Sequence, residues 1–258
     1  MDFDIKNIKR IVIKVGTSTL AHPTGRLNLR RVESLVKVLA DIKNTGKEIV
    51  LVSSGAIGVG AGVLGMTERP RETVAKQAAA AVGQCELMNV YGEEFGKYGH
   101  KVAQILLTKD VVNNEKSNVN AKNTFMKLLE LGALPVVNEN DTISTEEAEF
   151  GDNDNLSAVV ALLSGAELLI ILTDIDGVYN ANPREVEGAE KIAVLEDIDS
   201  AMKNAGGAGS KHGTGGMITK LEAAKIAREG GIHTIIASGN SPESLYDILE
   251  GKSVGTLI

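Results

Sequence analysis

Short runs of apolar, mostly β-branched residues recur along the chain and predict the strands of a sheet. Because the runs are nearly continuous in apolar character, we expect strands that are buried on both faces. The runs lie at residues 11–13, 49–52, 102–107, 134–137, 168–172 and 234–237.

Longer stretches between these runs carry apolar residues at three- and four-residue steps, which is the spacing of one helix face. Such spacing occurs at 35–42, 128–131 and 221–227, and the last stretch precedes Gly230 and Gly231, a typical helix stop. Strands that alternate with helices favour parallel pairing and right-handed crossovers. We therefore predict an α/β fold, a three-layer αβα sandwich around a mainly parallel sheet.

Composition changes this picture little, but it excludes several classes of protein. The 258 residues are 43% hydrophobic and 24% charged, which is typical of a folded domain. A net charge of −7 and few aromatic residues argue against nucleic acid or an anionic membrane as partner. No apolar run approaches the roughly 20 residues of a membrane helix, and the N-terminus lacks a signal-like apolar region.

The single cysteine, Cys85, cannot form an internal disulfide, so we expect a reducing compartment, the cytoplasm. It follows an alanine run at 78–81, and we expect a packed thiol on a helix rather than a nucleophile. The four histidines show no zinc-type spacing with cysteine or carboxylate residues. The histidines therefore predict no zinc site, and no individual residue is assigned as a metal ligand.

Two familiar phosphate-binding motifs match the sequence only in part, so neither is predicted. Residues 251–253 match the end of a P-loop, but Tyr246 stands where its first glycine is required. Glycines 60, 62 and 65 match a dinucleotide fingerprint, but the preceding strand is expected to end near Val52, several residues too early. We expect these glycines to let a helix pack tightly against the sheet. A nucleotide-dependent dehydrogenase would rest on this misplaced fingerprint alone.

Other polar segments stand at the predicted ends of strands. Lys14 follows the first strand, where an ammonium group is costly unless an anion meets it. Residues 53–56 follow the second strand, leave room for a ligand and place backbone N–H groups at a helix start. A lysine that snorkels to the sheet edge and a plain helix cap are the alternative interpretations.

Carboxylate and amide side chains are concentrated at residues 138–142 and 152–155. A helix start needs only one such residue as a cap, so these clusters favour a polar ligand with an amine, or a metal ion. Asp174, after another strand, could cap a turn or bind a ribose or an ammonium. The glycine-rich run 213–216 leads into a helix with Lys220, which favours a phosphate over a simple hinge.

Together these segments resemble the amino-acid kinase family, and within it the members that phosphorylate glutamate. The resemblance is carried by residues 12–18, 53–57, 138–141, 151–158, 172–179 and 213–220, which span nearly the whole chain. It implies a single domain over residues 1–258. An N-terminal lobe would bind the amino acid, and a C-terminal lobe from about residue 165 would bind ATP.

The resemblance implies phosphoryl transfer from ATP, with Mg²⁺, to the γ-carboxylate of L-glutamate, giving L-glutamyl 5-phosphate on the route to proline. It implies Lys14 and Lys220 as catalytic lysines and Asp154 as the carboxylate that organises them. The implied substrate-binding residues are Ser54, Gly55, Ala56, Asp141, Asn153 and Asp152. The implied ATP-binding residues are Lys14, Thr173, Asp174, Thr214, Gly215, Gly216, Met217, Ile218, Thr219 and Lys220.

Members of this family are typically oligomeric and often inhibited by proline. The resemblance therefore implies a homo-oligomer, L-proline as a feedback inhibitor and a glutamyl-phosphate reductase as a partner. Many glutamate-phosphorylating members carry a C-terminal domain that resembles RNA-binding modules, and this chain stops where the kinase domain would end. The alternatives are a sister kinase acting on acetylglutamate, aspartate, carbamate or UMP, and a non-catalytic nucleotide or amino-acid sensor.

Overall fold

The computed structural model describes residues 4–22, 24, 26–144, 153–183, 185–205 and 215–258. Within these residues the strands form one seven-stranded sheet in the order β3-β4-β2-β1-β5-β6-β7. All pairings are parallel except that of β7 with β6. The strands are β1 (Arg10–Val15), β2 (Glu48–Ser53), β3 (Val102–Leu107), β4 (Leu134–Glu139), β5 (Leu168–Thr173), β6 (His233–Ser238) and β7 (Thr256–Leu257).

The six predicted strands are all present, as β1 to β6. Burial on both faces is confirmed for β1, β2, β4, β5 and the predicted residues 234–237 of β6, but it is wrong for β3, whose residues are mostly half-buried or exposed. β3 lies at the edge of the sheet, where fewer neighbouring elements cover a strand. β7 has only two residues, too few for a periodic pattern to predict it.

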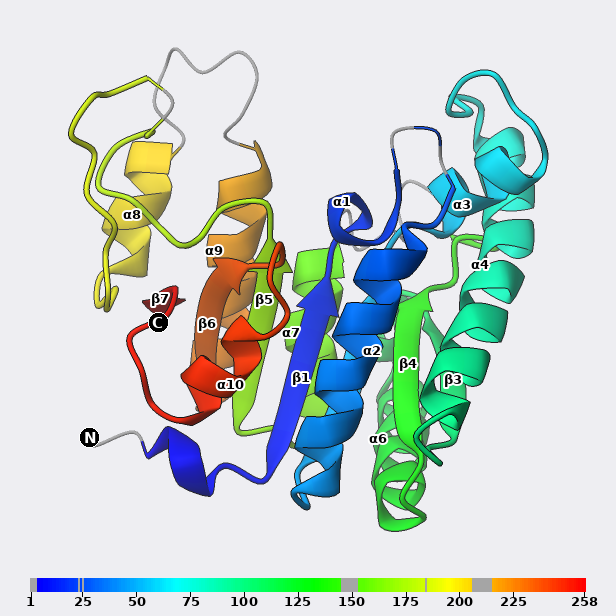
Figure 1. The fold of residues 1–258 in the computed structure, drawn as a ribbon, viewed down its shortest axis with the longest axis horizontal. Coiled ribbons are helices and arrows are strands. Elements are labelled where there is room, and N and C mark those ends of the chain that lie inside the picture. The colour runs from blue at the N-terminus through cyan, green and yellow to red at the C-terminus, as the bar shows by residue number, and fades with distance from the viewer. Residues whose placement is uncertain (1–3, 23, 25, 145–152, 184, 206–214) are drawn as a thin grey trace.

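Helices cover both faces of the sheet (Figure 1). Ile13 and Leu51 face one layer, made by α2, α4 and α10, while Val12 and Val50 face the other, made by α6, α7 and α9. This alternation follows from the two-residue period of a strand. The helices are η1 (Ile5–Asn7), α1 (Thr17–Leu20), α2 (Leu29–Asn44), α3 (Ala56–Val63), α4 (Thr73–Gly96), α5 (Asp110–Asn113), α6 (Glu115–Glu130), α7 (Asn153–Ser164), α8 (Ile198–Ala205), α9 (Gly215–Glu229) and α10 (Ser244–Leu249).

The chain diverges at the carboxyl ends of β1 and β5, which are neighbours in the sheet. From β1 it returns through α2, on one face, to β2. From β5 it returns through α8 and α9, on the other face, to β6. Where connections diverge in this way, an open α/β sheet has a crevice that commonly binds ligands. The carboxyl ends of β1 and β5 lie at the upper edge of the sheet in Figure 1, and a ligand site is expected there.

Helices α3 and α4 meet backbone to backbone. A Cβ atom at Gly60 would lie 1.8 Å from the carbonyl oxygen of Ala79, and one at Gly83 would lie 1.9 Å from that of Ala56. The expectation of tight glycine packing is therefore right for Gly60, but the expected partner is wrong. Gly60 packs against a helix and not against the sheet, and this contact holds the start of α3 against α4.

Cys85 lies on α4, a helix as predicted, but its side chain is exposed and the expectation of a packed thiol is wrong. Its neighbour Gln84 is buried, because each helix residue is rotated about 100° from the previous one. None of the helices among the described residues combines the length and apolar character needed to cross a membrane.

Candidate active site

A buried carboxylate joins two buried lysines at the carboxyl edge of the sheet. Asp154 Oδ1 lies 2.6 Å from Lys14 Nζ, and Asp154 Oδ2 lies 2.9 Å from Lys220 Nζ. Thr219 Oγ1 donates to Asp154 Oδ2 at 3.1 Å, and Lys220 Nζ donates to the carbonyl of Gly216 at 2.8 Å. We call Lys14, Asp154 and Lys220 the lysine–aspartate centre.

Three separate elements bring these side chains together. Lys14 follows Val12 by two residues on β1, so it points to the face of the sheet that α7 and α9 cover. Asp154 is in the first turn of α7 and Lys220 is in the second turn of α9. Because α7 packs against both β1 and α9, its first turn places Asp154 between Lys14 and Lys220.

The charges of this centre depend on one another. Burial by itself would raise the pKa of Asp154, but the charges and hydrogen bonds of Lys14 and Lys220 outweigh it and hold that pKa below its ordinary value. The carboxylate is therefore ionised at neutral pH. The three side chains together carry one more positive charge than negative charge, which suits the binding of an anion such as a phosphate group.

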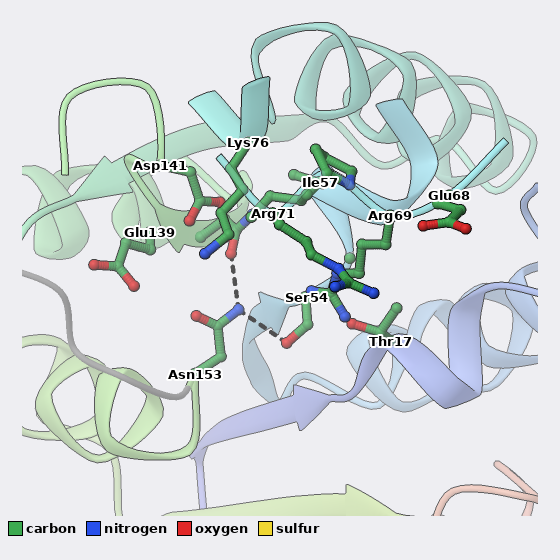
Figure 2. A pocket seen from close by; sticks show the side chains of 14 residues that line it. Thr17, Ser54, Ile57, Glu68, Arg69, Arg71, Lys76, Glu139, Asp141 and Asn153 are labelled. Atoms are coloured by element: carbon green, nitrogen blue, oxygen red, sulfur yellow. Dashed lines mark hydrogen bonds between the residues drawn. The ribbon is translucent and has the colours of Figure 1, made fainter. Parts of the chain in front are cut away.

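A polar pocket of about 750 Å³, shown in Figure 2, includes Asn153, the residue directly before Asp154 of the centre. It is built by the carboxyl ends of β2 and β4, the starts of α3 and α7, and the segment that leads into α4. Gly55 makes the turn from β2 into α3 with a φ of 102°, a left-handed conformation that favours glycine. The lining residues are Thr17, Ser54, Gly55, Ala56, Ile57, Glu68, Arg69, Pro70, Arg71, Lys76, Asn138, Glu139, Asp141 and Asn153.

The pocket carries acidic and basic side chains on different elements. Asp141 follows β4, whereas Arg69 and Arg71 belong to the segment between α3 and α4, and Lys76 belongs to α4. In Figure 2, Asp141 lies towards one end of the pocket, Arg69 towards the other and Arg71 between them. An amino acid carries both signs of charge, so such a pocket can bind its ammonium and carboxylate groups at separate places.

A chain of buried and partly buried hydrogen bonds supports one side of the pocket. Asn153 Nδ2 lies 2.8 Å from Ser54 Oγ, 2.8 Å from Asn138 Oδ1 and 3.0 Å from the carbonyl oxygen of Ser53. Asn138 Nδ2 in turn donates to Gln84 Oε1 at 2.9 Å. The ends of β2 and β4 are thereby tied to α4 and to the first residue of α7.

Tyr91 extends this support along α4. Its hydroxyl lies 3.0 Å from Ser53 Oγ, and its side chain is fully buried. Burial raises the pKa of Tyr91 to about 12, so the phenol stays protonated and neutral at physiological pH.

The structure places the predicted site residues in distinct groups. Ser54, Gly55, Ala56, Asp141 and Asn153 line the pocket, while Lys14, Asp154, Gly216, Thr219 and Lys220 meet at the centre. Thr173 and Asp174 stand at the end of β5, where Thr173 Oγ1 donates to Asp174 Oδ1 at 3.1 Å. Gly215, Met217 and Ile218 lie in the first turn of α9, where Met217 packs against the core. Asp152 and Thr214 lie outside the described residues.

Strand register relates the pocket to the end of β5. Lys14 pairs with Val52 on β2 and with Ile171 on β5. Ser54 comes two residues after Val52, on one side of Lys14, and Thr173 comes two residues after Ile171, on the other side. Lys14 therefore lies between the pocket and the predicted nucleotide residues of β5.

Sequence reasoning missed the basic side of the pocket and its support from α4. Arg69, Arg71 and Lys76 belong to a charged stretch that, in sequence, cannot be distinguished from a solvated loop. Gln84 belongs to an otherwise ordinary helix. Only the position of α4 beside β4 brings these residues to the site.

Among the residues that the structure describes, no group of three or more His, Cys, Asp or Glu side chains could hold a metal ion. The parallel sheet and the lysine–aspartate centre at its carboxyl edge define the class of protein: a small-molecule kinase with a three-layer α/β fold. The model of the Amino acid kinase family matches residues 9–238, and the chain belongs to this family.

Curated relatives agree over nearly the full length. A glutamate 5-kinase of Clostridium perfringens is 54% identical, over 98% of this chain and 96% of the relative. A glutamate 5-kinase of Clostridium acetobutylicum is 50% identical, over 98% and 95%. Among solved structures, carbamate kinase from Giardia lamblia bound to AMP-PNP has a TM-score of 0.68 at 17% identity, over 98% and 99% of the two chains. This last likeness confirms the predicted fold.

Proposed function

We propose that the chain transfers the γ-phosphoryl group of ATP to the γ-carboxylate of L-glutamate, giving L-glutamyl 5-phosphate and ADP. This is the activity in the names of its two Clostridium relatives, and it is the first step towards proline. The observation that carries the proposal is the position of the pocket, which has both acidic and basic side chains, next to the lysine–aspartate centre. An amino acid in that pocket lies beside a positively charged centre. That centre can stabilise the phosphoryl group while it is transferred to the amino acid.

In our proposal the glutamate lies with its γ-carboxylate towards Lys14 and its α-carbon deeper in the pocket. Ser54 and the backbone N–H groups at the start of α3 support the γ-carboxylate. Asp141 pairs with the α-ammonium group, and the basic side chains of Arg71 and Lys76 are the candidates for the α-carboxylate. The acidic side chain of Asp141 and the basic side chains of Arg71 and Lys76 in the pocket lining support this orientation.

ATP is proposed to bind on the other side of Lys14. Thr173 and Asp174 are there at the end of β5, and the N-terminus of α9 favours negative charge through its backbone N–H groups and dipole. The run Thr214 to Lys220 would hold the phosphates, with Gly215 and Gly216 permitting close approach. The division into an amino-acid lobe and an ATP lobe from about residue 165 is part of this proposal.

The chemistry needs positioning and charge neutralisation more than proton transfer. An oxygen of the γ-carboxylate forms a bond to the γ-phosphorus while the bond from that phosphorus to the ADP oxygen breaks. The attacking carboxylate is already ionised, so no general base is required. Lys14 and Lys220 stabilise the negative charge on the phosphoryl oxygens, and Asp154 holds both lysines in place. Mg²⁺, bound with the ATP phosphates, supplies further neutralisation.

Several further features of the proposal rest on the family resemblance alone. They are a homo-oligomeric state, feedback inhibition by L-proline and a glutamyl-phosphate reductase as a partner. A cytoplasmic location is also proposed, and the exposed thiol of Cys85 is consistent with a reducing compartment.

The deciding experiment measures ADP release from ATP and Mg²⁺ with L-glutamate, N-acetylglutamate, L-aspartate, carbamate or UMP as the acceptor. Hydroxylamine traps the acyl phosphate as a hydroxamate. We expect ADP release and hydroxamate formation with L-glutamate. Turnover with a different acceptor would keep the kinase class and replace the substrate. Folded protein that binds ATP but turns over none of the five would instead be a sensor.

A further inference from the structure

We infer that Gln84 is a positioning residue that sets the direction of the hydrogen bonds with which the pocket meets its ligand. Gln84 is 8% exposed and does not itself line the pocket. It acts through Asn138 and Asn153, which do. The inference rests on the proposed function for the identity of the ligand, an amino acid with an ammonium group.

The amide of Asn138 has one donor end and one acceptor end. Gln84 Oε1 accepts from Asn138 Nδ2 at 2.9 Å, so the Asn138 Oδ1 atom points to the other side. There it accepts from Asn153 Nδ2 at 2.8 Å. Asn138 is 2% exposed, so a reversed amide could not replace these bonds with water.

The amide of Asn153 is oriented by its protein acceptors. Its two Nδ2 hydrogens point to Asn138 Oδ1, Ser54 Oγ and the carbonyl of Ser53. The remaining polar atom of the side chain is Oδ1, which Figure 2 shows on the side of the amide turned away from Ser54. Asn153 therefore offers the pocket an acceptor, suited to an ammonium group, in common with the carboxylate of Asp141.

Ser54 is the last member of the hydrogen-bond chain that runs from Gln84 through Asn138 and Asn153, which we call the relay. Its Oγ accepts from Asn153 Nδ2 at 2.8 Å, so its own hydroxyl hydrogen is directed elsewhere and can be donated to a carboxylate in the pocket. Gln84 Oε1, acting through Asn138, and the Ser53 carbonyl, which can only accept, both favour the orientation in which Asn153 is an acceptor towards the ligand and Ser54 a donor. This polarity matches the ammonium and the carboxylate of an amino acid.

Removing the acceptor at position 84 allows the relay to reverse. With Asn138 turned over, its Nδ2 would face Asn153 Nδ2, donor against donor. Asn153 would then either lose its acceptor on Asn138, or turn, give up the Ser53 carbonyl and present its NH₂ group to the ligand's ammonium. The loss should therefore fall on recognition of the ammonium and spare the rest of the ligand.

The test compares the binding of L-glutamate with that of glutarate, which lacks the ammonium group, by titration calorimetry on the full chain. Gln84→Met keeps the side-chain length without an oxygen acceptor, and Gln84→Ala is a second variant in case the first does not fold. Gln84→Glu keeps an acceptor at the same place. Gln104→Met, at an exposed position on β3, is the matched control.

We expect Gln84→Met and Gln84→Ala to lower the preference for L-glutamate over glutarate by about tenfold, the effect of one lost hydrogen bond to a charged group. Gln84→Glu and Gln104→Met should keep the wild-type preference. A preference unchanged in Gln84→Met and Gln84→Ala would overturn the inference, as would equal weakening of both ligands or a wild-type chain with no preference. ADP release by the wild type is measured separately. Its absence alone would refute the proposed function and leave the binding comparison decisive for Gln84.

Discussion

Lys14 on β1 and Asp154 on α7 form a buried ion pair, with 2.6 Å between Nζ and Oδ1, where the chain connections of the sheet diverge. Lys220 reaches the second oxygen of the same carboxylate from α9. One aspartate thereby holds two ammonium groups, one at each of its carboxylate oxygens. This arrangement orients positive charge before any phosphate arrives, which is the condition for effective electrostatic stabilisation of a transition state.

The first prediction concerns the two lysines. Lys14→Ala or Lys220→Ala should each lower kcat/KM by a factor of about 100 or more, because each removes a preorganised charge worth about 3 kcal/mol in the transition state. Steady-state ADP release measures the effect. Lys225→Ala, on the exposed face of the same helix as Lys220, is the matched control and should be nearly neutral. Near-wild-type turnover in either site variant would refute the assigned role.

Asp154→Asn should destabilise the fold by about 3–5 kcal/mol, because it removes a buried negative charge that pairs with two buried ammonium groups. Denaturant unfolding followed by circular dichroism measures the change. A variant as stable as the wild type would show that the two lysines are neutralised by other groups.

The ion pairs of Asp154 with Lys14 and Lys220 predict a dependence of stability on pH. The pKa of Asp154 is held below its ordinary value of 3.8, so its contribution to stability is complete above that pH and is lost as the pH falls through the lower, folded-state pKa. The difference in unfolding free energy between wild type and Asp154→Asn should therefore be constant at pH 5–7 and shrink in more acidic buffers. A difference that stays the same under acidic conditions would contradict a depressed pKa.

Asp141→Asn should raise the KM for L-glutamate by about tenfold or more, because a neutral amide cannot pair with the α-ammonium group as a charge. The KM for ATP should stay unchanged, since Asp141 lines the pocket in which we propose that glutamate binds. Initial rates at varied glutamate and ATP concentrations separate the two constants. Asp110→Asn, at an exposed position in α5, is the control. An unaltered glutamate KM in Asp141→Asn would exclude this role.

Gly60→Ala should lower the unfolding free energy by about 2 kcal/mol or more, because its Cβ would lie 1.8 Å from the Ala79 carbonyl oxygen and force α3 away from α4. Gly96→Ala, at the end of α4 where a Cβ meets nothing within 4 Å, is the matched control and should be neutral or stabilising. Thermal unfolding of both variants gives the comparison. Equal melting temperatures would mean that the two helices adjust freely.

Much of the fold could be predicted from the chain alone, because strands and helices have local periodic signals. The apolar runs located β1 to β6, and Gly230 with Gly231 marked the end of α9. Where prediction failed, the cause was a distant neighbour. β3 is half exposed because it lies at the sheet edge, Cys85 is exposed because α4 turns another face inward, and Gly60 packs on a helix that follows it in the chain.

For the site, the sequence by itself determined which chemical groups stand at the ends of strands and helices: Lys14, Ser54, Asp154 and Lys220. Polar residues that end an apolar run can be recognised without knowing the fold. Only the tertiary structure decided that Asp154 lies between both lysines, that a basic segment borders the pocket, and that Gln84 terminates the hydrogen-bond relay through Asn138. These relationships depend on how α4, α7 and α9 pack against the sheet, and that packing is set by contacts between residues far apart in the chain.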